Sequence, residues 1–146
     1  MKFGWINWIN IVVVVCLILI NIIVARKGLS DSFSSKHMTV NILEQIGRYG
    51  CMALMILPIG VRNWKFGFGS VTEMLLWVCL TILLLGIYVF LWLKKSKGGA
   101  GIFYGLAIVP VVLFLLNGIL LRHPALVVVT LVFGFFHIII VKENVR

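Results

Sequence analysis

The chain has 146 residues, of which 62% are hydrophobic and 12% are charged, and its mean hydropathy is +1.17. A soluble domain is roughly half apolar and about a quarter charged, so this composition excludes an ordinary soluble protein and predicts an integral membrane protein. The net charge of +9 would suggest nucleic-acid binding in a soluble chain. Here the basic residues flank apolar stretches, so we expect contacts with the bilayer and its anionic lipid headgroups, and no nucleic acid.

Five apolar stretches predict an all-α, polytopic transmembrane bundle of five spanning helices. The length suits one integral membrane domain, residues 1–146, without a separate soluble domain. The expected spans are about 5–25, 40–61, 71–93, 101–121 and 124–141. The first stretch is too long for the core of a signal peptide and no small-residue cleavage site follows it, so we expect a retained helix.

The first span carries three asparagines, Asn7, Asn10 and Asn21. They fall near one face of a helix, because separations of three and eleven residues both return to nearly the same direction. We expect these amides to face the bundle and to form hydrogen bonds with other helices.

The second span has too few apolar residues to cross a membrane by itself. Its apolar part, Tyr49–Val61, is about 13 residues long, and a helix rising 1.5 Å per residue needs more to cross roughly 30 Å of hydrocarbon. A spanning helix must therefore include the preceding polar residues Asn41, Glu44, Gln45 and Arg48. These fall within an arc of roughly 100°, so we expect one polar face that avoids lipid and meets other helices or water.

The third and fifth spans begin with capping signals. Ser70 and Glu73 match a capping box, in which the serine oxygen accepts the backbone N–H three residues on and the glutamate reaches back. His123 precedes Pro124, and we expect the histidine to cap a helix whose first residue is the proline.

We expect the chain to lie in the plasma membrane. The distribution of basic residues predicts that its N-terminus is outside the cell and its C-terminus is in the cytoplasm. In this orientation nine basic residues are cytoplasmic, and four are outside, as the positive-inside rule requires. The cytoplasmic ones are Arg26, Lys27, Lys36, Arg48, Lys94, Lys95, Lys97, Lys142 and Arg146; the others are Lys2, Arg62, Lys65 and Arg122.

Polar residues of all five spans then fall at a similar depth. They lie about one helical turn inside the cytoplasmic boundary, roughly 5–10 Å deep. If they face inward, they form a polar pocket in the inner leaflet. The candidate ligand-binding residues are Asn21, Asn41, Glu44, Gln45, Arg48, Tyr104 and His137, and Tyr88 lies at the same depth.

This pattern favours a non-enzymatic membrane protein that binds or passes a small polar or anionic ligand. The alternatives are an accessory or immunity-type protein and a membrane-embedded enzyme. The first would dock to a larger membrane complex, or to a second copy, through the GxxxG pair Gly101 and Gly105. The second would act on lipid headgroups through Glu44 and His137. Glu44 and Arg48 are also spaced to form a purely structural ion pair.

The cysteines and histidines give no sign of a metal site. Cys16, Cys51 and Cys79 all lie in apolar stretches without a CxxC spacing, and we interpret them as small buried hydrophobic residues. No set of His, Cys and carboxylate residues has the spacing of metal ligands. We therefore assign no catalytic residue, no metal and no cofactor.

Overall fold

The computed structural model describes residues 7–26, 34–59, 67–95 and 99–145. These residues form five α-helices: α1 (Trp8–Arg26), α2 (Met38–Ile56), α3 (Val71–Lys94), α4 (Ala100–Leu120) and α5 (Pro124–Asn144). The predicted all-α class is confirmed. Three of the helices, α3, α4 and α5, are long and apolar enough to cross a membrane, and α1 contains the shorter apolar stretch Trp8–Val24.

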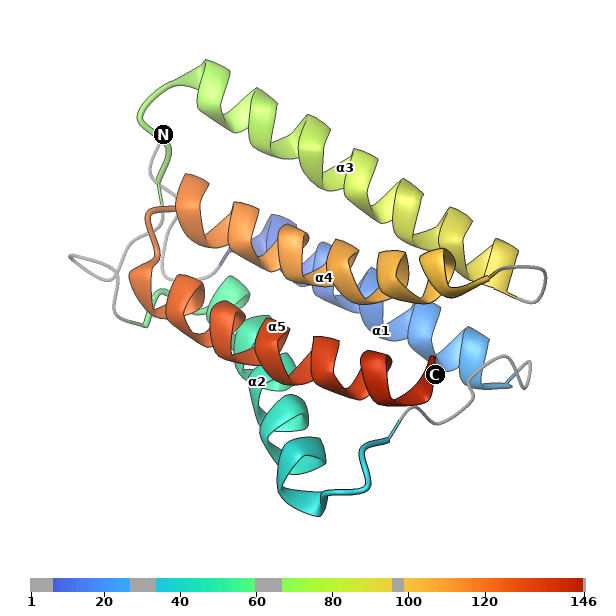
Figure 1. The fold of residues 1–146 in the computed structure, drawn as a ribbon. Coiled ribbons are helices and arrows are strands. Elements are labelled where there is room, and N and C mark those ends of the chain that lie inside the picture. Colours follow the sequence, from blue (N-terminus) through green and yellow to red (C-terminus); the bar gives the residue numbers. More distant parts are fainter. Residues whose placement is uncertain (1–6, 27–33, 60–66, 96–98, 146) are drawn as a thin grey trace.

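Four helices run alongside one another and the fifth is inclined to them (Figure 1). α4 packs between α3 and α5, α5 also packs against α2, and α1 contacts α2 and α3. The N-terminal end of α2 stands away from the other helices. We call the end at which α3 ends and α4 begins the Lys94 end, and the end at which α4 ends and α5 begins the Arg122 end.

α2 is helical through the polar stretch, as its short apolar part predicts. It begins at Met38, and its backbone continues without a break to Ile56. It ends earlier than the expected span, because Leu57 is already extended and Pro58 cannot donate a helical hydrogen bond. The expected span also includes residues 60 and 61, which lie outside the described residues.

Glycines allow close approach between helices at Gly47, Gly105 and Gly134. A Cβ added at Gly47 of α2 would lie 2.9 Å from Cβ of Phe133 in α5, which is closer than real Cβ atoms approach. Gly105 of α4 meets Leu91 of α3, whereas a Cβ at Gly101 would meet nothing within 4 Å. The two glycines of the GxxxG pair therefore do not share one contact, and Gly105 packs within the chain.

Two asparagines of the first helix join its start to the end of α2. Asn7 Oδ1 accepts the backbone N–H of Asn10 at 3.1 Å, as a helix cap does, and the Asn7 N–H donates to Ile56 O at 3.1 Å. Asn10 Nδ2 donates to Met55 O at 2.8 Å. Both side chains are fully buried, so the expected inward orientation is confirmed.

The two predicted helix caps are present. Ser70 Oγ accepts the backbone N–H of Glu73 at 3.1 Å, and Glu73 Oε2 accepts the N–H of Gly69 at 2.7 Å. The glutamate thus reaches back one residue further than a standard capping box. His123 Nδ1 accepts the N–H of Leu126 at 3.2 Å, and a proline is the first residue of α5.

One prediction about the cysteines is wrong. Cys51 is fully buried and its Sγ lies 3.5 Å from Thr130 Oγ1, but Cys16 is half-buried and Cys79 is exposed. Cys79 is on α3, which packs against α4 with one side and has fewer contacts with α1. The other side of α3 faces outward, so an apolar residue on that side, such as Cys79, is exposed.

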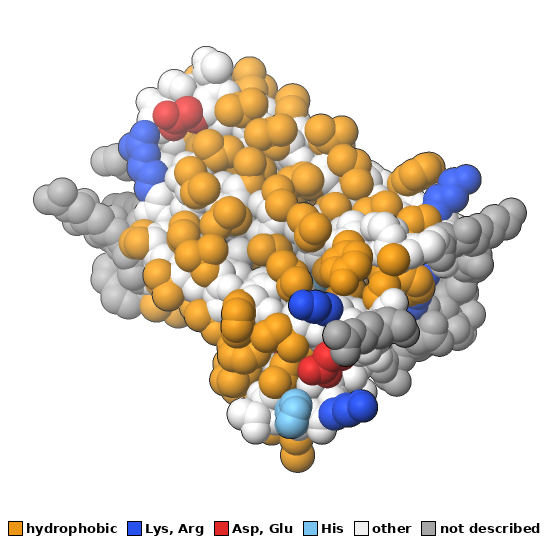
Figure 2. All heavy atoms as spheres, in the orientation of Figure 1, with side chains coloured by type: hydrophobic (Ala, Val, Ile, Leu, Met, Phe, Trp, Pro, Cys, Tyr) orange, Lys and Arg blue, Asp and Glu red, His pale blue; other side chains and the backbone are white. Residues whose placement is uncertain are grey.

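The exposed surface is largely apolar. Figure 2 shows hydrophobic side chains across the middle of one face, over α3, α4 and α5, while charged side chains gather toward the helix ends. Large apolar side chains such as Leu83, Phe90 and Phe135 are more than half exposed. A monomeric soluble protein rarely exposes so much continuous apolar surface, so this surface supports the predicted membrane location.

Candidate ligand-binding pocket

A cavity of about 320 Å³ lies between the helices, in the half of the bundle nearer the Lys94 end. All five helices contribute to its walls. Its volume is at the lower end of the roughly 300–1,000 Å³ typical of small-molecule sites. The polar side chains that line it are Asn21, Gln45, Arg48, Tyr88, Trp92 and His137.

A buried carboxylate organises one wall of the cavity. Glu44 is 2% exposed, and its Oε1 atom accepts a hydrogen bond from Arg48 Nη2. His137 Nδ1 lies 2.8 Å from the same oxygen. This close contact is not aligned as a hydrogen bond, and Nδ1 has no hydrogen-bond partner among the described residues. We call Glu44, Arg48 and His137 the Glu44 cluster.

The helix geometry explains why these three side chains meet. Glu44 and Arg48 are four residues apart, so they lie one above the other on one face of α2. Gly47, on the same part of α2, lets the backbone of α5 approach at Phe133. His137 follows Phe133 by one helical turn and stacks on its ring, with centroids 4.9 Å apart. The close approach at Gly47 therefore brings the imidazole to the carboxylate.

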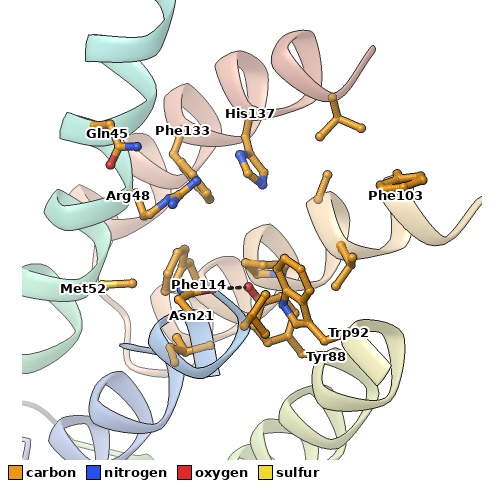
Figure 3. Close-up of a pocket in the computed structure, with 16 residues that line it drawn as sticks. Asn21, Gln45, Arg48, Met52, Tyr88, Trp92, Phe103, Phe114, Phe133 and His137 are labelled. Carbon is orange, nitrogen blue, oxygen red and sulfur yellow. Dashed lines mark hydrogen bonds between the residues drawn. The ribbon is translucent and has the colours of Figure 1, made fainter. Parts of the chain in front are cut away.

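The Arg48 side chain contacts Glu44 and also lines the cavity. Its side chain is 30% exposed, whereas that of Glu44 is 3% exposed. A guanidinium has five N–H donors, so the bond to Glu44 leaves others for a ligand. Figure 3 shows Arg48 and His137 on one side of the cavity, with Gln45 farther out on α2. The ion pair and an open cavity thus coexist.

The opposite wall holds neutral hydrogen-bonding groups. The Tyr88 hydroxyl donates to Asn21 Oδ1 at 3.0 Å and so joins α3 to α1 (Figure 3). The Trp92 ring meets Tyr88 edge-on, with centroids 6.2 Å apart. Trp92 Nε1 is buried and has no hydrogen-bond partner among the described residues. This indole donor is therefore available to a molecule in the cavity.

Apolar side chains form the rest of the cavity wall. Phe114 and Phe133 meet edge-to-face with centroids 5.7 Å apart, and both line the cavity with Met52 and Leu106. Aromatic and aliphatic side chains of this kind give a site a low dielectric environment, which strengthens any electrostatic contact within it.

A further cation lies at the edge of the cavity toward the Lys94 end. Lys95 is only 6% exposed. Its Nζ lies 4.9 Å from the ring centre of Trp92 and 5.7 Å from that of Phe103, and both rings line the cavity. These are cation–π distances, so the aromatic rings hold a positive charge close to the site.

The structure brings together four of the seven candidate residues on the cavity surface. Asn21, Gln45, Arg48 and His137 line it, and they come from α1, α2 and α5. Glu44 lies behind Arg48 and His137 and contacts both.

The other two candidates lie elsewhere. Asn41 binds the backbone of Ser35 twice, accepting its N–H at 2.7 Å and donating to its carbonyl at 2.9 Å. These bonds stabilise the segment before α2. Tyr104 is not among the lining residues, and its neighbour Phe103 lines the cavity instead. The rotation of α4 about its axis decides which of two adjacent residues faces inward.

Sequence reasoning missed the aromatic walls. Trp92, Phe103, Phe114 and Phe133 lie in helices that are apolar on nearly every side. Such helices have no polar face to show which side is turned inward, so the sequence gives no signal for these residues.

No protein-family model, no curated protein and no solved structure matches this chain. Within the described residues, no group of three or more His, Cys, Asp and Glu side chains is arranged to hold a metal ion.

Proposed function

We propose that this chain is a multi-pass plasma-membrane protein that binds, or passes, a small anionic ligand in the cavity. The observation that supports this most directly is the position of Arg48. Its guanidinium is anchored by a buried carboxylate and still borders a cavity of ligand size. A buried ion pair contributes little net stability, because desolvation offsets the attraction. A charged cluster beside a cavity within a membrane protein is therefore better explained by a ligand than by stability.

The charges around the cavity favour an anion. Arg48 lines it, and the Lys95 ammonium is held at its edge by two of the lining aromatic rings. Glu44 is the counter-charge of the guanidinium and lies behind it, away from the cavity surface. An anionic group in the cavity meets the guanidinium before it meets the carboxylate.

The remaining walls favour a ligand with a small apolar body. Met52, Leu106 and Phe114 offer only apolar surface to the cavity. The amide of Asn21 and the indole N–H of Trp92 add a few neutral hydrogen-bonding groups on the wall opposite Arg48. A compact aromatic or branched anion, with one charged group, matches this combination of surfaces.

A binding titration tests the proposal. The protein in lipid nanodiscs is titrated with benzenesulfonate and with its neutral analogue benzenesulfonamide. We expect the sulfonate to bind more tightly, and Arg48→Gln to weaken its binding by about tenfold or more, because a charge-assisted hydrogen bond contributes roughly 1.5–3 kcal/mol.

Arg122→Gln is the matched control, because Arg122 is exposed at the other end of the bundle. It should leave the affinity unchanged. Thermal melting of both variants shows whether they are folded. Equal affinity for the two probes, or for the folded Arg48→Gln variant and the unaltered protein, would contradict the proposal.

The enzyme alternative has one observation in its favour. Glu44 and His137 are 2.8 Å apart, a distance compatible with an acid–base pair acting on a lipid headgroup. Replacement of His137 by alanine would then abolish turnover of phospholipid in reconstituted vesicles while the protein remains folded. Absence of turnover in the unaltered protein would exclude this alternative.

A further inference from the structure

The Glu44 cluster has a charge balance that an incoming anion must disturb. Glu44 and Arg48 cancel one another, and the imidazole of His137 touches the same carboxylate oxygen as the guanidinium. All three side chains are largely buried, with 3%, 30% and 16% of their surfaces exposed. A net negative charge in such surroundings is costly, because little water is available to solvate it.

The titratable groups that face His137 are few. α2 presents Glu44 and Arg48, and α3 presents Tyr88 on the opposite wall. From α1 and α4, no titratable side chain is among the described lining residues. Lys95 lies at the edge of the cavity, against Trp92 and Phe103.

An anion at Arg48 binds guanidinium donors that Glu44 leaves free, and its charge weakens the attraction between the guanidinium and the carboxylate. It also brings one negative charge into a cluster whose formal charge is zero when the imidazole is neutral. His137 is the group best placed to restore neutrality, because its Nδ1 lies 2.8 Å from the carboxylate and has no hydrogen-bond partner among the described residues. A protonated imidazole would donate to Glu44 as the guanidinium turns toward the ligand.

We infer that the pocket takes up its anion together with one proton, which His137 holds against Glu44. This inference rests on the proposed function. One anion and one proton enter together, so the charge of the site does not change. The proton comes from the aqueous phase.

The test uses benzenesulfonate, which stays ionised throughout the pH range, so any proton taken up is bound by the protein. Affinity is measured by calorimetry in nanodiscs between about pH 5.5 and pH 8, in buffers of different ionisation enthalpy. We expect uptake of about one proton per anion in the upper part of this range. There the affinity falls by about tenfold per pH unit, the slope for one linked proton.

Two variants assign the proton. In His137→Asn the amide nitrogen replaces Nδ1 but does not titrate, so proton uptake should fall close to zero and the affinity should become independent of pH. Glu44→Gln leaves the charge of Arg48 unopposed. The affinity at about pH 8 should therefore rise, and anion binding should no longer be accompanied by proton uptake. His37→Asn is the matched control, because His37 is exposed before α2 and makes no side-chain cap bond.

The outcomes separate this inference from the proposed function. Binding that does not vary with pH in the unaltered protein, or full proton uptake in His137→Asn, overturns proton-linked binding and leaves anion binding intact. Absence of binding at every pH overturns both. A weaker affinity in folded Glu44→Gln also contradicts the inference, because it would show that the carboxylate only supports Arg48.

Discussion

Polar side chains join helices that otherwise meet through apolar contacts. Trp77 Nε1 donates to Asn117 Oδ1 at 2.8 Å and connects α3 to α4, while Asn117 Nδ2 donates to Leu113 O within α4. Hydrogen bonds of this kind contribute only about 0.6–2 kcal/mol each in lipid. They have a specific direction, however, and so fix the rotation of helices whose apolar surfaces look alike.

Among single residues, His123 is expected to make the stability of the fold depend on pH. Its Nδ1 accepts the N–H of Leu126, so in the neutral ring the proton is on Nε2, which donates to Leu57 O at 3.2 Å. Burial lowers the pKa of His123 below its usual value of 6.5, although hydrogen bonds to backbone groups act in the opposite direction. The folded protein thus favours the neutral ring.

A histidine whose pKa is lowered by folding contributes its full stability above the unfolded value, about 6.5. This contribution decreases as the pH falls from there toward the lowered pKa. We therefore expect the melting temperature of the unaltered protein in detergent to be lower at about pH 5 than at about pH 7.5. His123→Asn keeps a capping oxygen but does not titrate, so its melting temperature should fall by less over the same pH interval. An equal loss in both proteins would contradict the assignment.

At the scale of the helices, α2 is the element that shapes the site. It is inclined to the other four, and its N-terminal end stands away from them (Figure 1). It crosses α5 at Gly47 and carries Glu44 and Arg48 on the same segment. Its polar half therefore reaches the cavity beside this close contact between the two helices.

Substitution of Gly47 tests this contact. In Gly47→Ala the new Cβ would lie 2.9 Å from Phe133 Cβ and 3.0 Å from its Cα, so the backbone of α5 must move. We expect a loss of about 1–3 kcal/mol in the free energy of unfolding, measured by denaturation in mixed micelles. Gly101→Ala is the matched control: its Cβ has open space, so stability should be unchanged or slightly higher. Equal effects of the two substitutions would show that α2 and α5 are not in close contact.

The helices themselves were predictable to a large extent. Long apolar stretches and capping residues such as Ser70 and His123 fix where α3 and α5 begin. The second helix includes Glu44 and Arg48, as its short apolar part requires. Among the described residues, however, only α3, α4 and α5 are long and apolar enough to cross a membrane, so a spanning α2 stays a prediction. The expected span runs past the observed end at Ile56, because the apolar stretch continues beyond Pro58, although that proline is itself a signal for the end of a helix.

At the scale of the whole molecule, charge and apolar surface are segregated along the bundle. On the face drawn in Figure 2, apolar side chains cover the middle and charged ones gather toward the ends. Among the described residues, more basic residues lie at the Lys94 end than at the Arg122 end. Those at the Lys94 end include the exposed Arg26, Lys94 and Lys142. The positive-inside rule then predicts a cytoplasmic Lys94 end.

Cysteine labelling of intact cells tests this orientation. In a background without the native cysteines, Arg122→Cys should react with a membrane-impermeant maleimide, and Lys142→Cys should react only after permeabilisation. Both positions are exposed and lie at opposite ends of the apolar helix α5. The reverse pattern would contradict the predicted orientation, and labelling of both from outside would contradict a spanning α5.

The candidate site was predictable only where polarity marks a face. Glu44, Arg48 and Asn21 are unusual in apolar surroundings, and each lies at or beside the cavity. Tyr104 is expected at the same depth in the membrane, but it is not among the residues that line the cavity. Phe114 lines the cavity, but nothing in the sequence distinguishes it from other apolar residues. Depth follows from position in the sequence, whereas direction depends on how helices rotate as they pack, and apolar helices do not encode that rotation in their polarity.

The central claim is that an anion binds beside Arg48 within the bundle. A structure of the protein with 4-bromobenzenesulfonate, grown in a lipid phase and measured at the bromine absorption edge, tests it most directly. We predict one bromine peak between the helices near Phe114, with the sulfonate at the Arg48 guanidinium. Bromine found only on the outer apolar surface or at the Arg122 end, with the cavity empty, would contradict the account.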